Sequence, residues 1–254
     1  MMLRRELAYF FGAIRFFTRL PVPAWVGHSA EALNHSARYF PAVGLLVGAI
    51  GALVYLAAGQ VWPSSVAILL SMAATIYATG AFHEDGLSDT VDGLGGGWDK
   101  LRILEIMKDS RVGSYGVIAM ALALLGKFIL LDSLAPALLP AALIAGHALS
   151  RFCSTLLLAC MDYVREDLLA KAKPLATGLS GGEMLTAAAF VLPALAFLPL
   201  QKLLVGCLLA ALVTLWLAAK FKRWLGGYTG DCLGATQQLS EIAFYLGLLA
   251  AWPT

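Results

Sequence analysis

The chain has 254 residues, of which 60% are apolar and 13% are charged, and its mean hydropathy is +0.79. Soluble domains carry roughly 25% charged and about half apolar residues, so this composition excludes an ordinary soluble domain and indicates a membrane protein. The formal net charge of +2 indicates no class of partner. The composition makes the lipid bilayer a partner, and we expect no nucleic-acid partner.

The first segment, "MMLRRELAYFFGAIRFFTRLPVP" (residues 1–23), differs from a cleaved signal peptide. Glu6, Arg15 and Arg19 interrupt its apolar run, and no small-residue cleavage site follows. We predict an amphipathic helix lying at the membrane interface within an N-terminal segment of residues 1–38. Its apolar side comprises Leu7, Phe10, Phe11, Ile14 and Phe17.

Long apolar runs follow, each near the length of about 20 residues that crosses a bilayer core of roughly 30 Å. Pro193 and Pro199 interrupt one of them, which makes it the weakest. We predict an all-α, polytopic integral membrane protein with about seven transmembrane helices, near residues 40–61, 65–82, 113–132, 135–160, 184–199, 202–220 and 233–252.

The basic residues are distributed unevenly between the two predicted sides of the membrane. With the N-terminus inside, the outer loops keep only Lys202, and short cytoplasmic loops are enriched in Lys and Arg. We therefore predict that the N-terminus and the polar segments 83–112, 161–183 and 221–232 are cytoplasmic. The inner basic residues are Arg4, Arg5, Arg15, Arg19, Arg38, Lys100, Arg102, Lys108, Arg111, Arg165, Lys171, Lys173, Lys220, Lys222 and Arg223.

No internal repeat or domain boundary divides the chain, so we expect residues 1–254 to form one membrane-embedded catalytic domain. The four cysteines have no CxxC spacing, which indicates neither a zinc site nor a disulfide framework. They lie in or beside apolar spans, where small side chains pack well, at positions Cys153, Cys160, Cys207 and Cys232.

The stretch "FHEDGLSDTVDGLGGG" (82–97) gathers acids without a Lys or Arg among them. If it is helical, Asp85, Asp89 and Asp92 are spaced i, i+4, i+7 and project within an arc of about 60°. Three ionised carboxylates so close repel one another unless a cation lies among them, and Mg²⁺ or Mn²⁺ prefers such oxygen ligands. The alternative is a solvated, charged loop, but such loops mix charges, whereas here the bases follow the acids.

The next residues extend this acidic segment, 83–112, into a predicted catalytic loop. Glycines at 93 and 95–97 allow backbone amides to approach a phosphate, although a flexible turn explains them equally well. In "WDKLRILEIMKDSRVGSYG" (98–116) we predict a helix at the inner membrane surface with an apolar edge of Leu101, Leu104 and Met107. Asp109 adds a carboxylate, and Lys108 and Arg111 suit phosphate oxygens. Together these residues predict a site for a pyrophosphate-bearing substrate.

Polar residues also occur inside predicted spans. His147 and Arg151, four residues apart, share one helix face and are functional candidates by their position in the bilayer. Lys127 is either functional or paired structurally with an acid. His83, beside the acids, suits a general base, a metal ligand or a membrane-edge residue.

The stretch "GGYTGDCLGATQQLSE" (226–241) begins the last span with polar residues. A polar start is costly in an apolar helix unless it faces a cavity or a partner. We therefore expect Asp231, Gln237, Gln238 and Glu241 to close the site. Helix capping by Thr229 or Asp231 is compatible with this role.

Five segments carry a resemblance to a known family: "FFTRLPVP" (16–23), "HEDGLSDTVDGL" (83–94), "LEIMKDSRVGSYG" (104–116), "SR" (150–151) and "GGYTGDCLGA" (226–235), the last followed by Glu241. They resemble adenosylcobinamide-GDP ribazoletransferase, also called cobalamin synthase or cobalamin 5'-phosphate synthase. The resemblance implies a Mg²⁺-dependent, multi-pass enzyme of the bacterial cell (inner) membrane. Such an enzyme joins adenosylcobinamide-GDP to alpha-ribazole or alpha-ribazole 5'-phosphate late in vitamin B12 biosynthesis and releases GMP.

We assign roles on this basis. The expected metal ligands are Asp85, Asp89, Asp92 and Asp109, and the expected general base is His83 or one of the acids. Charge stabilisation should outweigh acid–base help, because phosphoryl transfer relies mainly on positioning and electrostatics. The residues expected to bind substrate are Lys108, Arg111, Ser114, Arg151 and Asp231.

Two other functions share some of these features. A CDP-alcohol phosphotransferase motif begins D-x-x-D-G, as Asp89–Gly93 does, but it requires an Ala-Arg pair where Gly96 and Gly97 stand. A cation transporter would place its acids near the bilayer midplane rather than in a cytoplasmic loop. The sequence leaves open the oligomeric state, a homo-oligomer included, and the choice between ribazole and its 5'-phosphate.

Overall fold

A computed structural model describes residues 2–27, 29–164 and 178–250 of the chain, so part of the predicted polar segment 161–183, with Arg165, Lys171 and Lys173, lies outside the described residues. Within the described residues the protein is helical, with one isolated β-bridge between Tyr163 and Tyr228. The α-helices are α1 (Met2–Phe17), α2 (Ala30–Ser36), α3 (Phe40–Ala58), α4 (Ser64–Thr79), α5 (Phe82–Gly96), α6 (Lys100–Ile106), α7 (Ser114–Asp132), α8 (Leu139–Cys160), α9 (Gly181–Leu195), α10 (Leu200–Leu225) and α11 (Gly230–Leu248).

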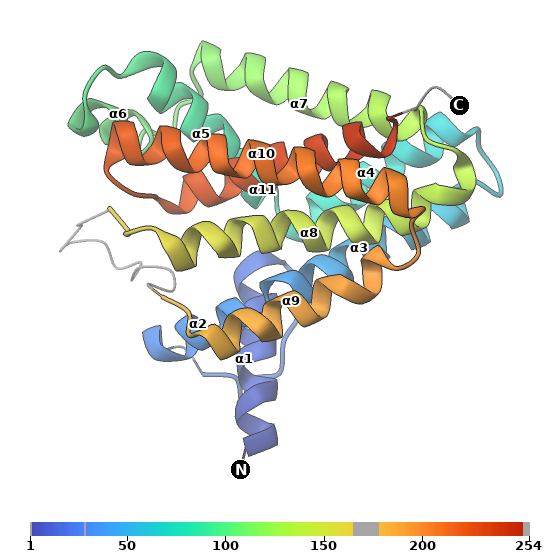
Figure 1. Cartoon of the computed structure of the whole chain (residues 1–254), viewed down its shortest axis with the longest axis horizontal. Helices are drawn as coiled ribbons and strands as arrows, with labels where there is room; N and C mark the ends of the chain where they lie inside the picture. Colours follow the sequence, from blue (N-terminus) through green and yellow to red (C-terminus); the bar gives the residue numbers. More distant parts are fainter. Residues whose placement is uncertain (1, 28, 165–177, 251–254) are drawn as a thin grey trace.

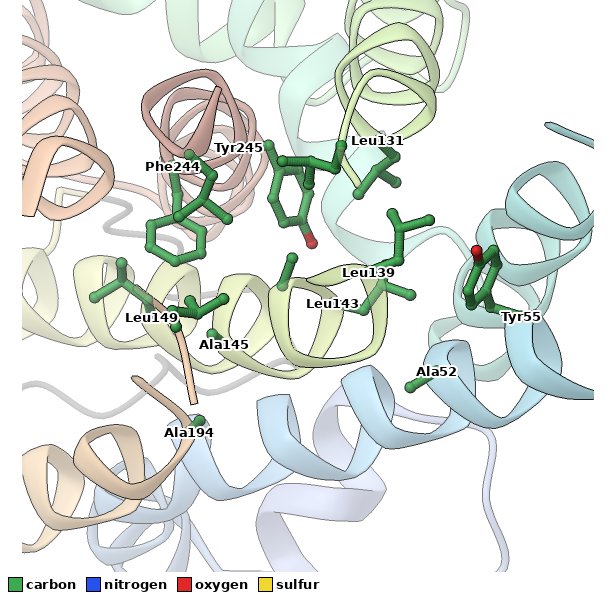
Figure 2. Packing of buried hydrophobic residues seen from close by; sticks show 14 of the residues in the cluster. Ala52, Tyr55, Leu131, Leu139, Leu143, Ala145, Leu149, Ala194, Phe244 and Tyr245 are labelled. Carbon is green, nitrogen blue, oxygen red and sulfur yellow. The ribbon is translucent and has the colours of Figure 1, made fainter. Parts of the chain in front are cut away.

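Helices α8 and α11 form the centre of the bundle. Helix α11 packs against α5, α7, α8 and α10, and α8 packs against α3, α9 and α11 (Figure 1). Phe244 and Tyr245 of α11 lie against Leu143 and Leu149 of α8 in the larger apolar core (Figure 2). A side chain at Gly146 would collide with the Tyr245 ring, so glycine allows this close approach of α11 to α8.

Four helical segments of the described chain are long and apolar enough to cross a membrane: Glu31–Ala58, Ser114–Asp132, Pro136–Cys160 and Leu200–Leu225. The pair α4 and α5 makes a fifth if it is one span, bent by 85°. The predicted count of seven is therefore not confirmed. Helix α9 is apolar but short, with Pro193 inside it, and α11 carries several polar residues that face the interior of the bundle.

The bend between α4 and α5 corrects the prediction of a polar loop at 83–112. Helix α4 ends at Gly80 in the left-handed conformation, with φ of 67°, and Ala81 also has a positive φ, of 58°. The chain turns there and enters α5, which packs against α7 and α11 instead of extending into solvent. Helix α6 follows, and Ile103 within it and Met107 at its C-cap are buried, whereas the predicted edge residue Leu101 is exposed.

The N-terminal segment forms the predicted helix. Figure 1 shows α1 running across the direction shared by α3, α8 and α10. Ile14 and Phe17 are buried on its apolar side, while Leu7 is exposed. Glu6, four residues before Phe10 in the same helix, accepts a hydrogen bond of 2.8 Å from the Tyr39 hydroxyl.

Candidate active site

The acidic helix α5 lies directly against the N-terminal part of α11. The two backbones approach closely at Gly86 and Gly234, where a Cβ atom on either glycine would meet the backbone of the other helix. Small residues permit such close packing between membrane helices. Asp231 is thereby placed beside Gly86, and Thr229 caps α11 by accepting a hydrogen bond from the Cys232 amide at 3.3 Å.

The three aspartates of α5 differ in their surroundings. Asp85 is exposed, Asp89 is half-buried and Asp92 is buried. Asp85 and Asp89 lie four residues apart, so they share one face of the helix. The helix that the metal hypothesis requires is thus present, but its last carboxylate is enclosed.

Asp92 caps helix α7. Its two oxygens accept hydrogen bonds from the amides of Gly113, at 2.7 Å, and Gly116, at 2.8 Å. Gly113 is the N-cap residue of α7 and has no side chain to satisfy the first amides of the helix. A Cβ atom at either glycine would collide with the Asp92 carboxylate. Ser114, a predicted substrate-binding residue, is the first residue of α7 and is exposed.

Asp109 lies in the turn between α6 and α7 and pairs with Arg111. The shortest contact, between Arg111 Nη2 and Asp109 Oδ2, is 2.6 Å, and Arg111 Nε also donates to the carboxylate at 3.0 Å. Hydrogen bonds from the Arg111 side chain lower the pKa of Asp109 to about 2. Lys108 is exposed in the same turn, so this surface carries two bases and one acid.

His83 and Arg151 meet inside the bundle. His83 stacks on the Phe17 ring with 5.2 Å between ring centroids, and both residues line a pocket together with Phe40, Phe82, Ser154, Gly230, Leu233 and Gly234. Arg151 is 2% exposed and donates to the backbone oxygen of His147 at 3.1 Å. The pocket joins the first turn of α5 to the start of α11.

A charged network behind this pocket links α7, α8 and α11. Lys127 Nζ lies 2.6 Å from Glu241 Oε1, and both side chains are almost fully buried. The Tyr245 hydroxyl and Gln237 Nε2 also donate to Glu241, at 2.8 and 2.7 Å. Lys127 is therefore paired structurally with an acid, which is one of the two roles, functional or structural, that the sequence leaves open for it.

The structure does not gather the four predicted metal ligands. In the part of the chain that it describes, no group of three or more His, Cys, Asp or Glu side chains is placed to hold an ion. Both oxygens of Asp92 and both oxygens of Asp109 accept hydrogen bonds from N–H donors. Asp85 and Asp89 lie together on one face of α5. Mg²⁺ is usually held by one or two carboxylates together with substrate phosphates. The donor set fits that arrangement and does not fit a site made of four protein carboxylates.

Comparisons with known proteins identify the family. The family model described as cobalamin-5-phosphate synthase matches residues 9–249. The chain belongs to this family. It is 48% identical to an adenosylcobinamide-GDP ribazoletransferase of Shewanella amazonensis, with 98% of this chain and 97% of the relative covered. Relatives of the same name from Polaromonas sp. (49%; 93% and 94% covered) and Vibrio cholerae (45%; 98% and 95% covered) are also similar. No solved structure matches the chain.

This member of the cobalamin-5-phosphate synthase family is an all-α, multi-span membrane protein in which the predicted site residues fall into separate groups. His83 and Arg151 share a pocket near the start of α11, and Asp85 and Asp89 share a face of α5. Asp92 belongs to the cap of α7, and Asp109 pairs with Arg111 at the surface.

Glu84 was absent from the predicted site. Its side chain is buried and accepts a hydrogen bond of 3.0 Å from Gln238. The acid-rich stretch alone does not distinguish Glu84 from its neighbour Asp85. Glu84 differs from Asp85 because it faces α11. The sequence predicts that Gln237 and Gln238 of this helix face a cavity.

Proposed function

We propose that this chain catalyses the reaction that the name of its relatives describes, the transfer of a ribazole group onto adenosylcobinamide-GDP. The substrates are adenosylcobinamide-GDP and alpha-ribazole or alpha-ribazole 5'-phosphate, and the products are adenosylcobalamin or its 5'-phosphate and GMP. The match to the cobalamin-5-phosphate synthase model over residues 9–249 carries this proposal. The site supports it, because bases suited to a diphosphate are present in two of its groups: Arg111 beside Asp109 in the turn after α6, and Arg151 of α8 in the pocket with His83 of α5.

The reaction exchanges a phosphoanhydride bond for a phosphate ester bond. The ribazole hydroxyl oxygen bonds to the phosphorus nearer cobinamide, the bond from that phosphorus to the oxygen bridging to GMP breaks, and GMP leaves with the electron pair. The hydroxyl proton passes to a base, for which His83 or an acid of α5 is the candidate. Phosphoryl transfer depends mainly on positioning and charge stabilisation, so Arg151, Lys108 and Arg111 are assigned to the diphosphate.

Mg²⁺ is part of the proposal, with Asp85 and Asp89 as its protein ligands. Bound there with the diphosphate, the ion supplies positive charge for the oxygens on which negative charge develops. Asp92 keeps its place in the proposed site as the residue that fixes the start of α7, and Ser114 at that start and Asp231 beside Gly86 remain the candidate contacts for the substrates.

The proposed location is the bacterial inner membrane, with the N-terminus and the acidic helix toward the cytoplasm. The concentration of Lys and Arg on one predicted side supports this orientation. Labelling of single cysteines introduced at Lys108 and at Lys202 with a membrane-impermeant maleimide tests it. In intact spheroplasts the cysteine at 202 should react and the cysteine at 108 should react only after lysis, and the reverse pattern would refute the orientation.

Release of GMP from adenosylcobinamide-GDP tests the activity. Protein in nanodiscs should release GMP only when a ribazole substrate and Mg²⁺ are both present. Asp89→Asn should abolish turnover without affecting insertion, whereas Asp132→Asn, at the other end of the bundle, should leave it unchanged. Absence of GMP from folded protein would refute the proposal, as would release of CMP from a CDP-alcohol in its place.

A further inference from the structure

A polar chamber lies at the centre of the bundle, behind the pocket that His83 and Arg151 share. Four helices line it, and each contributes two polar side chains: Thr75 and Thr79 from α4, His83 and Glu84 from α5, His147 and Arg151 from α8, and Gln237 and Gln238 from α11. All eight side chains are buried. A space lined by polar residues alone is unusual among apolar helices, because each polar group there needs a partner.

Three atoms of the lining residues have no hydrogen-bond partner within the described structure. They are Glu84 Oε2, Arg151 Nε and His147 Nε2, the last of which lies 3.6 Å from Glu241 Oε1, beyond hydrogen-bond distance. Glu84 Oε1, by contrast, accepts from Gln238 Nε2 at 3.0 Å, and Arg151 Nη1 donates to His147. Each of the three side chains is therefore held at one atom while a second atom remains without a partner. Buried polar groups are nearly always hydrogen-bonded, so three such atoms around one chamber indicate a common ligand.

The chemistry of these atoms restricts what the ligand is. Arg151 Nε is a donor only, an ionised Glu84 is an acceptor only, and a histidine nitrogen serves as either. One molecule that satisfies Glu84 and Arg151 together must both donate and accept, as a hydroxyl group does. The negative charge of Glu84 and the positive charge of Arg151 compensate each other, so the ligand needs no charge of its own. A buried water usually makes about three hydrogen bonds, which equals the number of unpartnered atoms.

We propose that the chamber holds one ordered water molecule that bridges Glu84 Oε2, Arg151 Nε and His147 Nε2, and that Glu84 thereby positions the acidic helix α5. Glu84 precedes Asp85 directly, and successive residues of a helix point about 100° apart. Holding Glu84 inward therefore holds Asp85 outward, toward the substrate side. No side chain caps the first turn of α5, which follows the bend at Ala81, so that turn is held by the contact of Glu84 with Gln238 and by the stacking of His83 on Phe17.

The Glu84 side chain is connected across the bundle. Gln238 donates to Gln237 at 2.9 Å, and Gln237 donates to Ser150 of α8 at 3.0 Å and to Glu241 at 2.7 Å. The bridging water closes this path from α8 back to α5. Glu84 is a positioning residue in this arrangement, because it acts through the orientation of Asp85 and Asp89 and contacts no substrate.

A high-resolution structure of the substrate-free protein in nanodiscs tests the water directly. The expected result is a single spherical density within hydrogen-bond distance of Glu84 Oε2, Arg151 Nε and His147 Nε2, which disappears in Glu84→Leu. An empty chamber in the wild type would overturn the proposal. So would an extended density that appears only when ribazole is added, because a substrate hydroxyl would then be the ligand.

Kinetics test the positioning role, which rests on the proposed function. Removing a group that orients metal-binding carboxylates typically lowers activity or metal affinity about 10- to 100-fold. Glu84→Leu should therefore lower kcat and raise the Mg²⁺ concentration needed for half-maximal activity, with KM for ribazole little changed. Glu84→Gln, which keeps the contact to Gln238, should recover most of the activity.

The exposed acid Glu31 provides a matched control, since Glu31→Leu should leave every parameter unchanged. Wild-type kinetics in Glu84→Leu would refute the positioning role, and so would equal damage in Glu84→Gln and Glu84→Leu. The two proposals fail separately. The spherical density with no GMP release would refute the function alone, whereas normal GMP release from a protein with an empty chamber would refute the water.

Discussion

Replacing Lys127 by methionine should destabilise the bundle strongly. The change removes the ammonium group 2.6 Å from Glu241 Oε1, within α7 and α11, and leaves a carboxylate that is almost fully buried. Breaking a buried ion pair from one side costs roughly 3–5 kcal/mol. Gln237 and Tyr245 still donate to Glu241, which favours the lower end of that range. Protonating a carboxyl of ordinary pKa near 4.3 at pH 7 costs about 3.7 kcal/mol, which limits the loss from above.

The expected loss is therefore about 3 kcal/mol of unfolding free energy, well above the ~0.6 kcal/mol average of a single hydrogen bond between membrane helices. Steric trapping in bicelles measures it without harsh denaturant. Lys222→Met, at an exposed position on α10, should change stability by less than about 0.5 kcal/mol. In the double variant Lys127→Met with Glu241→Gln the loss should be smaller than in the single variant, because no unpaired charge remains. A loss below about 1 kcal/mol for Lys127→Met would refute the reasoning, since the pair would then act as an ordinary hydrogen bond.

Three further predictions concern the backbone and the surface. Ala81→Gly should stabilise the protein by about 1 kcal/mol in the same assay, because glycine adopts the positive φ of 58° without strain; a loss would show that the bend is not strained. Gly116→Ala should destabilise by about 1–3 kcal/mol because its methyl group collides with the carboxylate that caps α7, whereas Gly126→Ala, in open space on the same helix, should be neutral or stabilising. Arg111→Gln should return the pKa of Asp109 from about 2 toward 3.8, as carboxyl NMR would show. Because that pKa is lowered, the pair contributes stability above about pH 4 and loses it as the pH falls toward 2; an unchanged pKa in the variant would refute the pairing.

The sequence predicted the helices well because hydrophobic runs and cap residues are local. Each of the seven predicted spans overlaps one helix, but α9 is short, and the helix at 65–82 ends where Gly80 turns the chain. What a hydropathy window does not show is which helix touches lipid. Helix α11 is built like a soluble core helix, with Gln238 and Glu241 buried, because its neighbours and not lipid surround it.

For the candidate site, the sequence predicted which residues share a helix face but not which residues they bind on other helices. The spacing of Asp85 and Asp89 places them together on any helix, and the structure keeps them so. The spacing also places Asp92 near the same face. Asp92 instead accepts hydrogen bonds from the amides of Gly113 and Gly116, more than 20 residues away in the sequence. A contact between distant segments has no local pattern. The glycines of "VGSYG" were the one indication that something approaches α7 closely.

The bend at Gly80 and Ala81 and the polar face of α11 answer the same physical requirement. A helix with four acids within nine residues is too polar to face lipid, so it must be enclosed by helices that offer donors or be turned away from the bilayer. The 85° turn redirects α5 against α11, and Gln238 supplies a donor to the acid that points inward. A non-glycine residue with positive φ at Ala81 costs of order 1–2 kcal/mol and persists only where its surroundings hold it. The Arg19 amide, which donates to the Ala78 oxygen at 2.8 Å, ties the end of α4 to the segment after α1. The strain therefore lies at the point that sets the direction of α5, and with it the direction of Asp85 and Asp89.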